Sequence, residues 1–373
     1  MKLSRLTLTD YRNISSLCIV PDETVNVICG ENAQGKTNLI EAIWLLTGNP
    51  SFRGAKASEL LRFGSECAKI EAAFTDRQRD QEISLRLGAK REIRLNDVPL
   101  KSTNELSGTF YAVVFSPAHL SFVKDGPSNR RRFLDIAISQ IKPQYKSYLM
   151  RYEKLMEQRN ALLKNASMYR DLAENIAVWD EQIAAIGTIL TIYRCDYIER
   201  VRRAASKIYE GLSGGRENLT VSYASTVFEK PFELKTYDKA WVLQYRQKLS
   251  EQFESDCRQG FTETGPHRDD LVLELDGNSA RSFGSQGQQR SCVIALKLAE
   301  AQVLKAACGE SPVMLLDDVM SELDRTRQQY ILNNLDGMQV FVTCCEPSQL
   351  SGLRHGKVFD MKNGCAAEWE KKG

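Results

Sequence analysis

Apolar and polar residues follow two periodicities along the chain. Apolar runs predict buried strands at 25–29, 110–115 and 313–316. Alternation over the first eight residues predicts a strand there, and short apolar segments predict others at 70–74, 83–87, 93–95, 219–223, 271–275 and 340–342. Helical character appears at 38–46, at 291–307 and from residue 325. The first 120 residues are therefore expected to be mainly strands.

A different texture runs from about residue 126 to residue 212. Between Pro127 and Gly211 it holds one proline, Pro143, and one glycine, Gly187. Its apolar residues recur at helical spacing in three stripes, which begin at Leu149, Ile176 and Val201. We interpret the stripes as the core of a lobe of antiparallel helices.

The composition is that of a soluble globular protein. The 373 residues include 50 Lys and Arg and 48 Asp and Glu, a net charge of +2. This balance excludes a wholly basic nucleic-acid coat and a wholly acidic tail. With 42% hydrophobic residues the chain is too apolar for intrinsic disorder. It has no long apolar run and no signal-peptide pattern, so we expect a cytoplasmic protein without a membrane span.

The ten cysteines do not have the spacing of a metal site. No Cys-x-x-Cys pair is present, and the three histidines are scattered. Without a secretory signal we expect reduced and mostly buried thiols, and neither disulfides nor zinc.

The strongest local motif is an eight-residue P-loop. Every fixed position of the pattern is matched by the run Gly30-Glu31-Asn32-Ala33-Gln34-Gly35-Lys36-Thr37. The glycines let backbone N–H groups converge on phosphates, and the following helix adds its positive end. Lys36 would reach the β- and γ-phosphates, and the Thr37 hydroxyl would bind Mg²⁺. The alternative is a glycine turn with an incidental lysine, but the strand before it and the helix after it favour the P-loop.

A P-loop needs a carboxylate at the end of a neighbouring strand to hold the metal. The apolar run 313–316 ends in Asp317 and Asp318. Asp317 is placed for the Mg²⁺ ion, and Asp318 could orient or deprotonate the attacking water. Alternatively, both acids only cap the next turn.

A third motif lies ahead of these acids, at Ser285-Gln286-Gly287-Gln288-Gln289. It resembles the Leu-Ser-Gly-Gly-Gln signature of ABC-type ATPases, with Ser285, Gly287 and Gln289 retained. The run Ser321-Glu322-Leu323-Asp324 resembles the loop that follows the acids in that superfamily. There, the signature of one subunit closes over the ATP held by the other, where a hydroxyl and a helix N-terminus can meet the γ-phosphate.

The P-loop and the paired acids are separated by many more residues along the sequence than in a transporter ATPase, and the helical lobe lies between them. The chain most resembles the RecF family of recombination mediators. This resemblance covers the whole chain and rests on six motifs in order: Tyr11-Arg12-Asn13, the P-loop through Asn38, Ser51-Phe52-Arg53, residues 126–135, residues 265–270 and residues 315–324.

The resemblance implies an α/β fold, an ABC-type P-loop ATPase head built from the N- and C-terminal segments with an inserted all-helical lobe. The head would take residues 1–122 and 263–373, the lobe 123–215, and a return segment 216–262. Besides Lys36, Asp317 and Asp318 in catalysis, and Thr37 with Asp317 at the metal, it implies a set of nucleotide contacts: Gly30 to Asn38, Arg12, Asn13, Ser285, Gly287 and Gln288.

The implied function is ATP-dependent DNA binding in recombinational gap repair and the SOS response. ATP and Mg²⁺ would drive homodimerisation on duplex DNA or on junctions with single strands, with little sequence preference. Slow, DNA-stimulated hydrolysis would reset this switch, and the protein would act with RecR, and indirectly with RecO, to help RecA load.

The chain departs from the ABC pattern at three positions. Asp318 stands where glutamate is usual, which suits slow hydrolysis and leaves open whether it is the base. Thr343-Cys344-Cys345 follow the strand that a histidine usually follows, and no glutamine loop is recognisable after Phe115.

Basic residues are concentrated in one segment, from residue 123 to residue 166, which has ten basic and four acidic residues. Phosphate contacts favour such an excess, so the candidate DNA contacts are Arg130, Arg131, Arg132, Lys142 and Lys146. Three arginines at a helix start oppose the helix dipole, which favours a nearby ligand or carboxylate. The alternative is a solvated helix face with intramolecular pairs.

Two other functions stay open. In one, nucleotide only stabilises a scaffold whose basic lobe binds protein, so that dimerisation and DNA binding ignore ATP. In the other, the chain is a transport or metabolic ATPase, which the helical insertion and the lack of a membrane segment disfavour.

Overall fold

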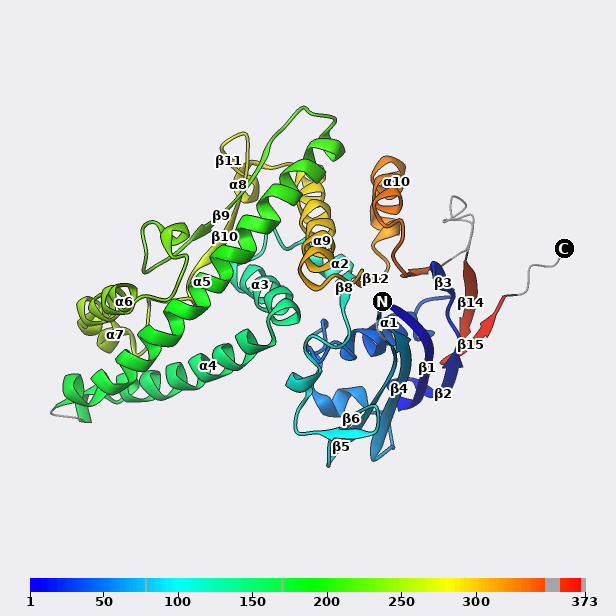
Figure 1. Ribbon diagram of the computed structural model, residues 1–373, viewed down its shortest axis with the longest axis horizontal. Coiled ribbons are helices and arrows are strands. Elements are labelled where there is room, and N and C mark those ends of the chain that lie inside the picture. The colour runs from blue at the N-terminus through cyan, green and yellow to red at the C-terminus, as the bar shows by residue number, and fades with distance from the viewer. Residues whose placement is uncertain (78, 169–170, 346–355, 370–373) are drawn as a thin grey trace. The chain divides into compact units, whose positions relative to one another are not determined.

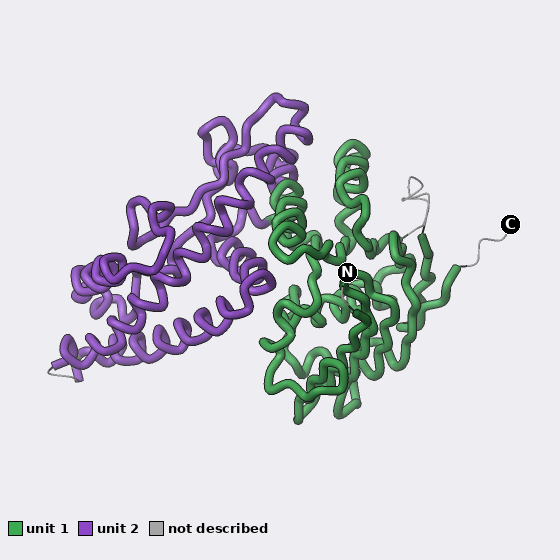
Figure 2. Tube along the Cα trace, viewed as in Figure 1, with its two compact units in different colours: residues 1–121, 293–373 green, residues 122–292 purple. Residues whose placement is uncertain are grey.

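The computed structural model describes residues 1–77, 79–168, 171–345 and 356–369. The chain divides into two compact units, coloured separately in Figure 2. Unit 1 contains Met1–Ser121 and Val293–Gly373, and unit 2 contains Phe122–Cys292. Among the described helices, none is both long and apolar enough to cross a bilayer.

Unit 1 contains an antiparallel sheet with the strand order β2-β1-β4-β5-β6-β7 (Figure 1). Its strands are β1 (Lys2–Tyr11), β2 (Ile14–Ile19), β4 (Cys67–Thr75), β5 (Asp80–Gly88), β6 (Glu92–Leu95) and β7 (Val98–Leu100). Buried and exposed residues alternate along β4 and β5, as expected for a sheet with one solvated face.

The second sheet of unit 1 joins the two ends of the chain. Its order is β15-β14-β3-β13-β12-β8, and its strands are β3 (Val25–Cys29), β8 (Ala112–Phe115), β12 (Val313–Leu316), β13 (Val340–Cys344), β14 (Lys357–Lys362) and β15 (Cys365–Glu368). All neighbours pair in parallel except β14 and β15, which are antiparallel. Every residue of β8, β12 and β13 is buried, so this sheet is the core of the unit.

Helices connect these strands. α1 (Lys36–Leu45) follows β3, α2 (Pro117–Leu120) follows β8, and α10 (Arg325–Asn334) leads from β12 to β13. The prediction of an α/β head assembled from both ends of the chain, with a large helical insertion, is confirmed.

Unit 2 is built around three long helices: α3 (Pro127–Ile141), α4 (Pro143–Lys164) and α5 (Leu172–Ser213). Gly187 lies in the middle of α5 because Tyr245 and Tyr152 pack directly on it. A Cβ there would overlap Tyr245 and lie 3.2 Å from Tyr152 Cε2. The interior glycine is thus explained by close packing inside the lobe.

The insertion is larger than the predicted all-helical lobe of 123–215. It also contains β9 (Leu219–Ala224), α6 (Lys239–Glu251), α7 (Phe253–Gln259), β10 (Asp270–Leu275), β11 (Asn278–Ser279) and α8 (Ala280–Phe283). Because β10 pairs with both β9 and β11, residues 216–292 pack within unit 2, although the predicted division placed 263–292 with the head. This pairing joins segments far apart in sequence, so helical periodicity gave no sign of it.

Buried arginines connect the elements of unit 2. Arg194 on α5 donates to Asp135 on α3 at 2.8 Å, to Tyr223 on β9 at 3.2 Å and to the Pro266 carbonyl at 2.5 Å. Arg159 on α4 bonds Asp180 and Asp256, both at 2.6 Å. Buried charges are tolerated only with such partners, so these side chains fix how the helices pack on the small sheet.

We predict that Gly265→Ala destabilises unit 2 far more than Gly277→Ala. Both glycines have positive φ, 136° and 79°, but a Cβ at position 265 would overlap the hydroxyls of Tyr245 and Tyr152, whereas position 277 faces open space. Overpacking and strain should cost Gly265→Ala about 2–4 kcal/mol, and strain alone should cost Gly277→Ala about 1 kcal/mol. Urea unfolding followed by tryptophan fluorescence measures the difference, and equal losses would contradict the packing argument.

Candidate nucleotide-binding site

The P-loop connects β3 to α1 at the carboxyl edge of the parallel sheet. Gly30 and Gly35 have φ of 147° and 111°, a region that side chains disfavour. A Cβ on Gly30 would overlap the Met361 carbonyl oxygen of β14, and one on Gly35 would lie 2.8 Å from Asn13 Oδ1. Both fixed glycines of the motif are therefore required by close backbone approaches.

Lys36 is buried at the start of α1. Its Nζ donates to the carbonyl oxygens of Gly30 at 2.5 Å and Glu31 at 3.0 Å. The ammonium group thus lies under the loop that it would serve, while residues 31–33 are exposed to solvent. Phosphate oxygens could take the place of these two carbonyls as partners of Nζ.

The first of the paired acids bonds to the P-loop. Thr37 Oγ1 donates to Asp317 Oδ1 at 2.9 Å. Thr343, at the end of β13, places its hydroxyl 3.2 Å from Asp317 Oδ1 and 3.3 Å from Asp318 Oδ1, and accepts the Asp318 N–H at 2.7 Å. Thr343, which stands near the position of the usual histidine, therefore bonds both acids, a role that the sequence analysis missed.

Asp317 is a carboxylate in need of a cation. Burial raises the pKa of Asp317 to about 6, and Asp318 adds to the rise, while hydrogen bonds from Thr37 and Thr343 oppose it. A bound cation would stabilise the charged form of this buried carboxylate. Carboxylate and hydroxyl oxygens are the ligands that Mg²⁺ prefers, so Thr37 and Asp317 fit that ion.

Glu41 on α1 accepts hydrogen bonds from several side chains behind the P-loop. It is fully buried and accepts from Arg12 Nε at 2.9 Å, Arg12 Nη2 at 3.0 Å and Tyr11 Oη at 3.1 Å. Ser51 also donates to it at 2.5 Å. Arg12, which was predicted to contact nucleotide, thus neutralises a buried carboxylate, and sequence reasoning did not identify Glu41.

Asn13 and Asn38 extend this support to the loop. Asn13 Nδ2 donates to the Ala33 carbonyl at 3.2 Å, Asn38 Nδ2 donates to Asn13 Oδ1 at 2.8 Å, and Arg53 Nη1 donates to Asn38 Oδ1 at 2.9 Å. Arg53 is also close enough to lower the pKa of Asp317. The motif 51–53, singled out without a role, therefore reaches the site.

The hairpin of β14 and β15 closes the other side of the loop. The backbone N–H groups of Asn363 and Gly364 donate to the side chain and the carbonyl of Gln34, at 2.6 and 3.1 Å. No recognisable signal in the sequence predicted this contact, since it depends on the parallel pairing of β14 with β3.

The signature lies in unit 2, at the start of α9 (Gln286–Cys308). This helix begins five residues earlier than the expected Ser291, because Ser285 and Gln288 cap it. Ser285 N donates to Gln288 Oε1 at 2.7 Å, and Gln288 N donates to Ser285 Oγ at 3.3 Å. Ser285 is exposed and Gly287 half-buried, so the exposed end of a long helix presents the motif.

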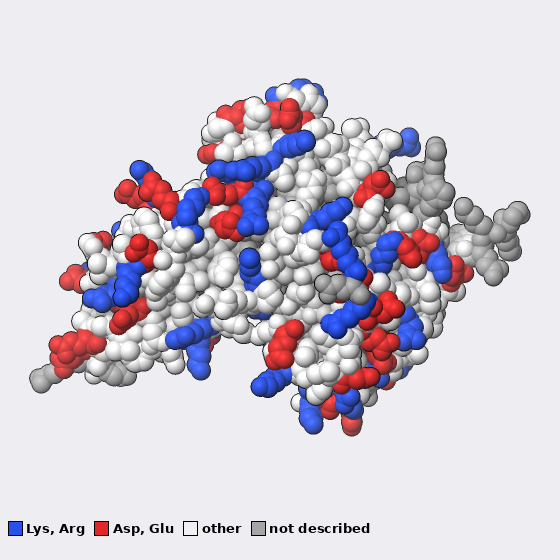
Figure 3. Space-filling model, viewed as in Figure 1, with Lys and Arg blue, Asp and Glu red and all other residues white. Residues whose placement is uncertain are grey.

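The basic segment divides into buried and exposed residues. Arg130 is buried, bonds Asp270 through Nε and Nη2 at 2.7 and 2.8 Å, and donates to three backbone carbonyls. Arg130 is therefore removed from the candidate DNA contacts. Asp270 is the nearby carboxylate that arginines at a helix start led us to expect. Arg131 and Lys146 are half-buried, and Arg132 and Lys142 are exposed. On the face shown in Figure 3, basic and acidic side chains are interspersed.

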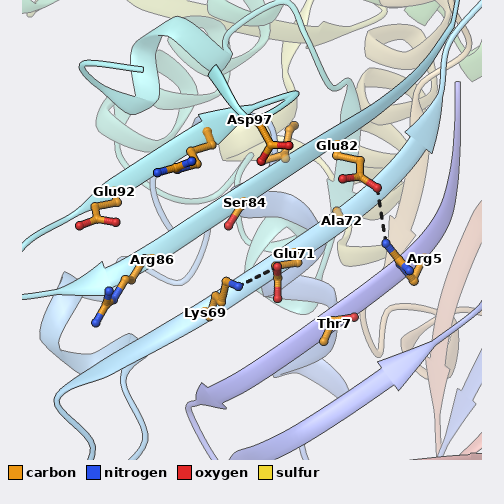
Figure 4. A pocket seen from close by; sticks show the side chains of 12 residues that line it. Arg5, Thr7, Lys69, Glu71, Ala72, Glu82, Ser84, Arg86, Glu92 and Asp97 are labelled. Atoms are coloured by element: carbon orange, nitrogen blue, oxygen red, sulfur yellow. Dashed lines mark hydrogen bonds and ion pairs between the residues drawn. The ribbon is translucent and has the colours of Figure 1, made fainter. Parts of the chain in front are cut away.

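A hollow of about 580 Å³ lies on the antiparallel sheet and is lined from β1, β4, β5 and β6, not by the P-loop (Figure 4). Its basic and acidic side chains are equal in number, with Lys69 bonded to Glu71 and Arg5 to Glu82. Without an excess of positive charge, it has no particular attraction for a nucleotide.

Comparisons with known proteins agree with this geometry. The family model described as "RecF/RecN/SMC N terminal domain" matches residues 2–366. The "DNA replication and repair protein RecF" of Alkaliphilus oremlandii is 40% identical over 95% of this chain and 96% of its own length. The protein of that name from Clostridioides difficile is 39% identical over 97% and 95%.

Solved structures give the same result. A structure described as the recombination mediator protein RecF-ATPrS in the RecFOR pathway has a TM-score of 0.92 and 33% identity, covering 99% of this chain and 98% of that chain. An SMC head bound to the C-winged helix domain of ScpA has a TM-score of 0.56 and 16% identity, with coverage of 99% and 98%, and shares only the fold.

We predict that Asp317→Asn stabilises the metal-free, nucleotide-free protein at neutral pH. The pKa of Asp317 is about 6 in the folded state, against 3.8 in the unfolded chain. The protonated form therefore favours folding, and wild-type stability falls as the pH rises from about 4 to 6. Asparagine avoids this loss, so the variant should gain about 2–3 kcal/mol at pH 8 and nothing at pH 3.5. Urea unfolding in EDTA at both pH values, followed by tryptophan fluorescence, tests the sign, and a gain independent of pH would refute the assignment.

Proposed function

Because the chain belongs to the RecF/RecN/SMC family, we propose that it is an ATP-dependent DNA-binding protein of recombinational gap repair and the SOS response. One observation carries the proposal: the hydrogen bond from Thr37 to Asp317 joins the P-loop to the acidic end of β12. Relatives that match nearly the full chain are RecF proteins, and a neighbouring structure is described as RecF-ATP in the RecFOR pathway.

ATP would bind with its phosphates in the P-loop, where Lys36 meets the β- and γ-phosphates. Mg²⁺ held by Thr37 and Asp317 would neutralise charge on the phosphates. Asn13, Asn38 and Glu41 keep the loop in shape, so little reorganisation is needed on binding.

Asp318 is the residue that would orient or deprotonate the attacking water. It has the left-handed φ of 51°, and Thr343 bonds both its N–H and its carboxylate. A carboxylate held this way, on a side chain one methylene shorter than glutamate, suits slow hydrolysis. Turnover would reset the protein, and the weak ATPase activity would serve the switch.

Dimerisation is the proposed output of ATP binding. Ser285, Gly287 and Gln288 at the exposed start of α9 would close over the ATP of a second copy, where the hydroxyl and the helix N-terminus stabilise the γ-phosphate. ATP shifts the equilibrium because it binds the dimer more tightly than the monomer.

The dimer would hold duplex DNA or a junction with a single strand, with little sequence preference. Arg132 and Lys142 are the exposed candidates for phosphate contacts. Gap repair would then proceed with RecR, and indirectly with RecO, to help RecA load, in keeping with the pathway named for the structural relatives.

The mass of the protein in solution, with and without ATP–Mg²⁺ and a short DNA duplex, tests the switch. We expect a monomer that becomes a DNA-holding dimer only with ATP. A mass and a DNA affinity that ignore ATP would replace the proposal with the scaffold alternative.

Ser285→Arg should bind ATP normally yet stay monomeric, because the side chain blocks the signature and leaves the P-loop intact. The matched control is Ser250→Arg, which adds the same charge at an exposed position of unit 2 on α6. Nucleotide titration and light scattering measure both properties, and normal dimerisation of Ser285→Arg would disprove the composite site.

A further inference from the structure

Two thiols lie in contact directly beneath the P-loop. All ten cysteines of the chain are free thiols, and they range from buried to exposed. Cys29 ends β3 and Cys344 ends β13, and the parallel pairing of these strands sets the two residues opposite each other. Their Sγ atoms are 3.2 Å apart, and both side chains are buried, with 2% and 5% exposure.

The backbone spacing at this pair suits a covalent bond. Neighbouring strands lie about 4.8 Å apart, within the range of about 4.4–6.8 Å found between the Cα atoms of disulfides. The thiol contact with Cys344 also lowers the pKa of Cys29. The Cys29 thiolate is thus the better nucleophile of the two.

We propose that Cys29 and Cys344 form a reversible disulfide that weakens nucleotide binding at the P-loop, with a small-molecule disulfide such as oxidised glutathione as the oxidant. One protein thiolate attacks a sulfur of the oxidant and releases one small thiol. The second protein thiolate attacks the resulting mixed disulfide and releases the other. The two protein thiols lose two electrons and two protons, and the oxidant becomes two thiols.

Access to this buried pair is provided by the sequence neighbour of Cys344. Cys345 is exposed, and its Sγ lies 3.7 Å from Asn32 Oδ1 in the P-loop. A mixed disulfide formed at Cys345 can pass to Cys344 with release of the Cys345 thiol, and Cys29 then attacks the Cys344 sulfur and displaces the small thiol. Direct attack during brief opening of the strand ends gives the same product.

The link would act on both halves of the site. Closing the sulfurs from 3.2 Å to about 2.0 Å draws together the residues that precede Gly30 and follow Thr343. A movement of Gly30 would reach the P-loop directly, because a Cβ at Gly30 would overlap the Met361 carbonyl oxygen and the Gly30 carbonyl accepts from Lys36. Thr343 holds Asp317 and Asp318. This part of the inference rests on the proposed nucleotide site.

The disulfide itself is tested on the full-length protein, incubated with oxidised glutathione, alkylated and digested. We expect a linked peptide pair whose fragments place the bond at Cys29 and Cys344. The link should persist in Cys345→Ala and be absent from Cys29→Ala and Cys344→Ala. No linked pair, or a bond that maps to Cys345 in its place, overturns the proposal.

The effect on nucleotide is measured by titrating a fluorescent ATP analogue into reduced, oxidised and re-reduced protein. Oxidation should weaken binding by about tenfold, dithiothreitol should restore it, and Cys29→Ala and Cys344→Ala should bind equally well in both states. Unchanged affinity of the linked protein overturns the proposed control of the site. If reduced wild type binds no nucleotide, the proposed function fails, while the peptide map still decides whether the disulfide forms.

Discussion

The parallel pairing of β3 with β13, and of β13 with β12, is the constraint on which the site depends. Parallel strands bring their carboxyl ends to one edge, so the P-loop after β3, Thr343 on β13 and the acids after β12 meet there. Their sequence positions are far apart, and the register of the strand pairing aligns them. A shift of one residue would move Asp317 away from Thr37 and turn its side chain to the other face.

A buried charge connects the segments behind this edge. Glu41 would be costly inside the head without partners, and it is neutralised by Arg12, with Arg53 3.9 Å away. The same two arginines come from segments that flank the loop, and the Asn13–Asn38 pair carries their positions to the P-loop backbone. Most of the motif residues outside the P-loop therefore bond to one another and to the loop, and in the proposed site Lys36 meets the phosphates while Thr37 holds the metal ion. Residues of one sequence motif therefore have different roles, some in supporting the loop and others in the proposed ligand contacts.

Unit 2 also contains buried ion pairs. Its arginines were counted as a basic surface, but Arg130 and Arg159 are buried against Asp270, Asp180 and Asp256. The acids that neutralise them come from distant segments, so a local excess of positive charge overstated what solvent or DNA can reach. The exposed remainder, with Arg132 and Lys142, is a smaller candidate surface.

The sequence by itself determined the α/β head, the inserted helices, the P-loop with Thr37 and the acids at the end of β12. The head is what the resemblance to the RecF family implied, and the other features follow from short-range signals: periodicity over a few residues, glycine spacing and a charged pair after an apolar run. Only the tertiary structure decided the roles of Glu41, Arg53 and Thr343, the closure by the β14–β15 hairpin, the burial of Arg130 and the contact of Cys29 with Cys344. Each of these depends on which distant segments become neighbours, because burial and hydrogen bonding are properties of the assembled packing and leave no local pattern in the chain.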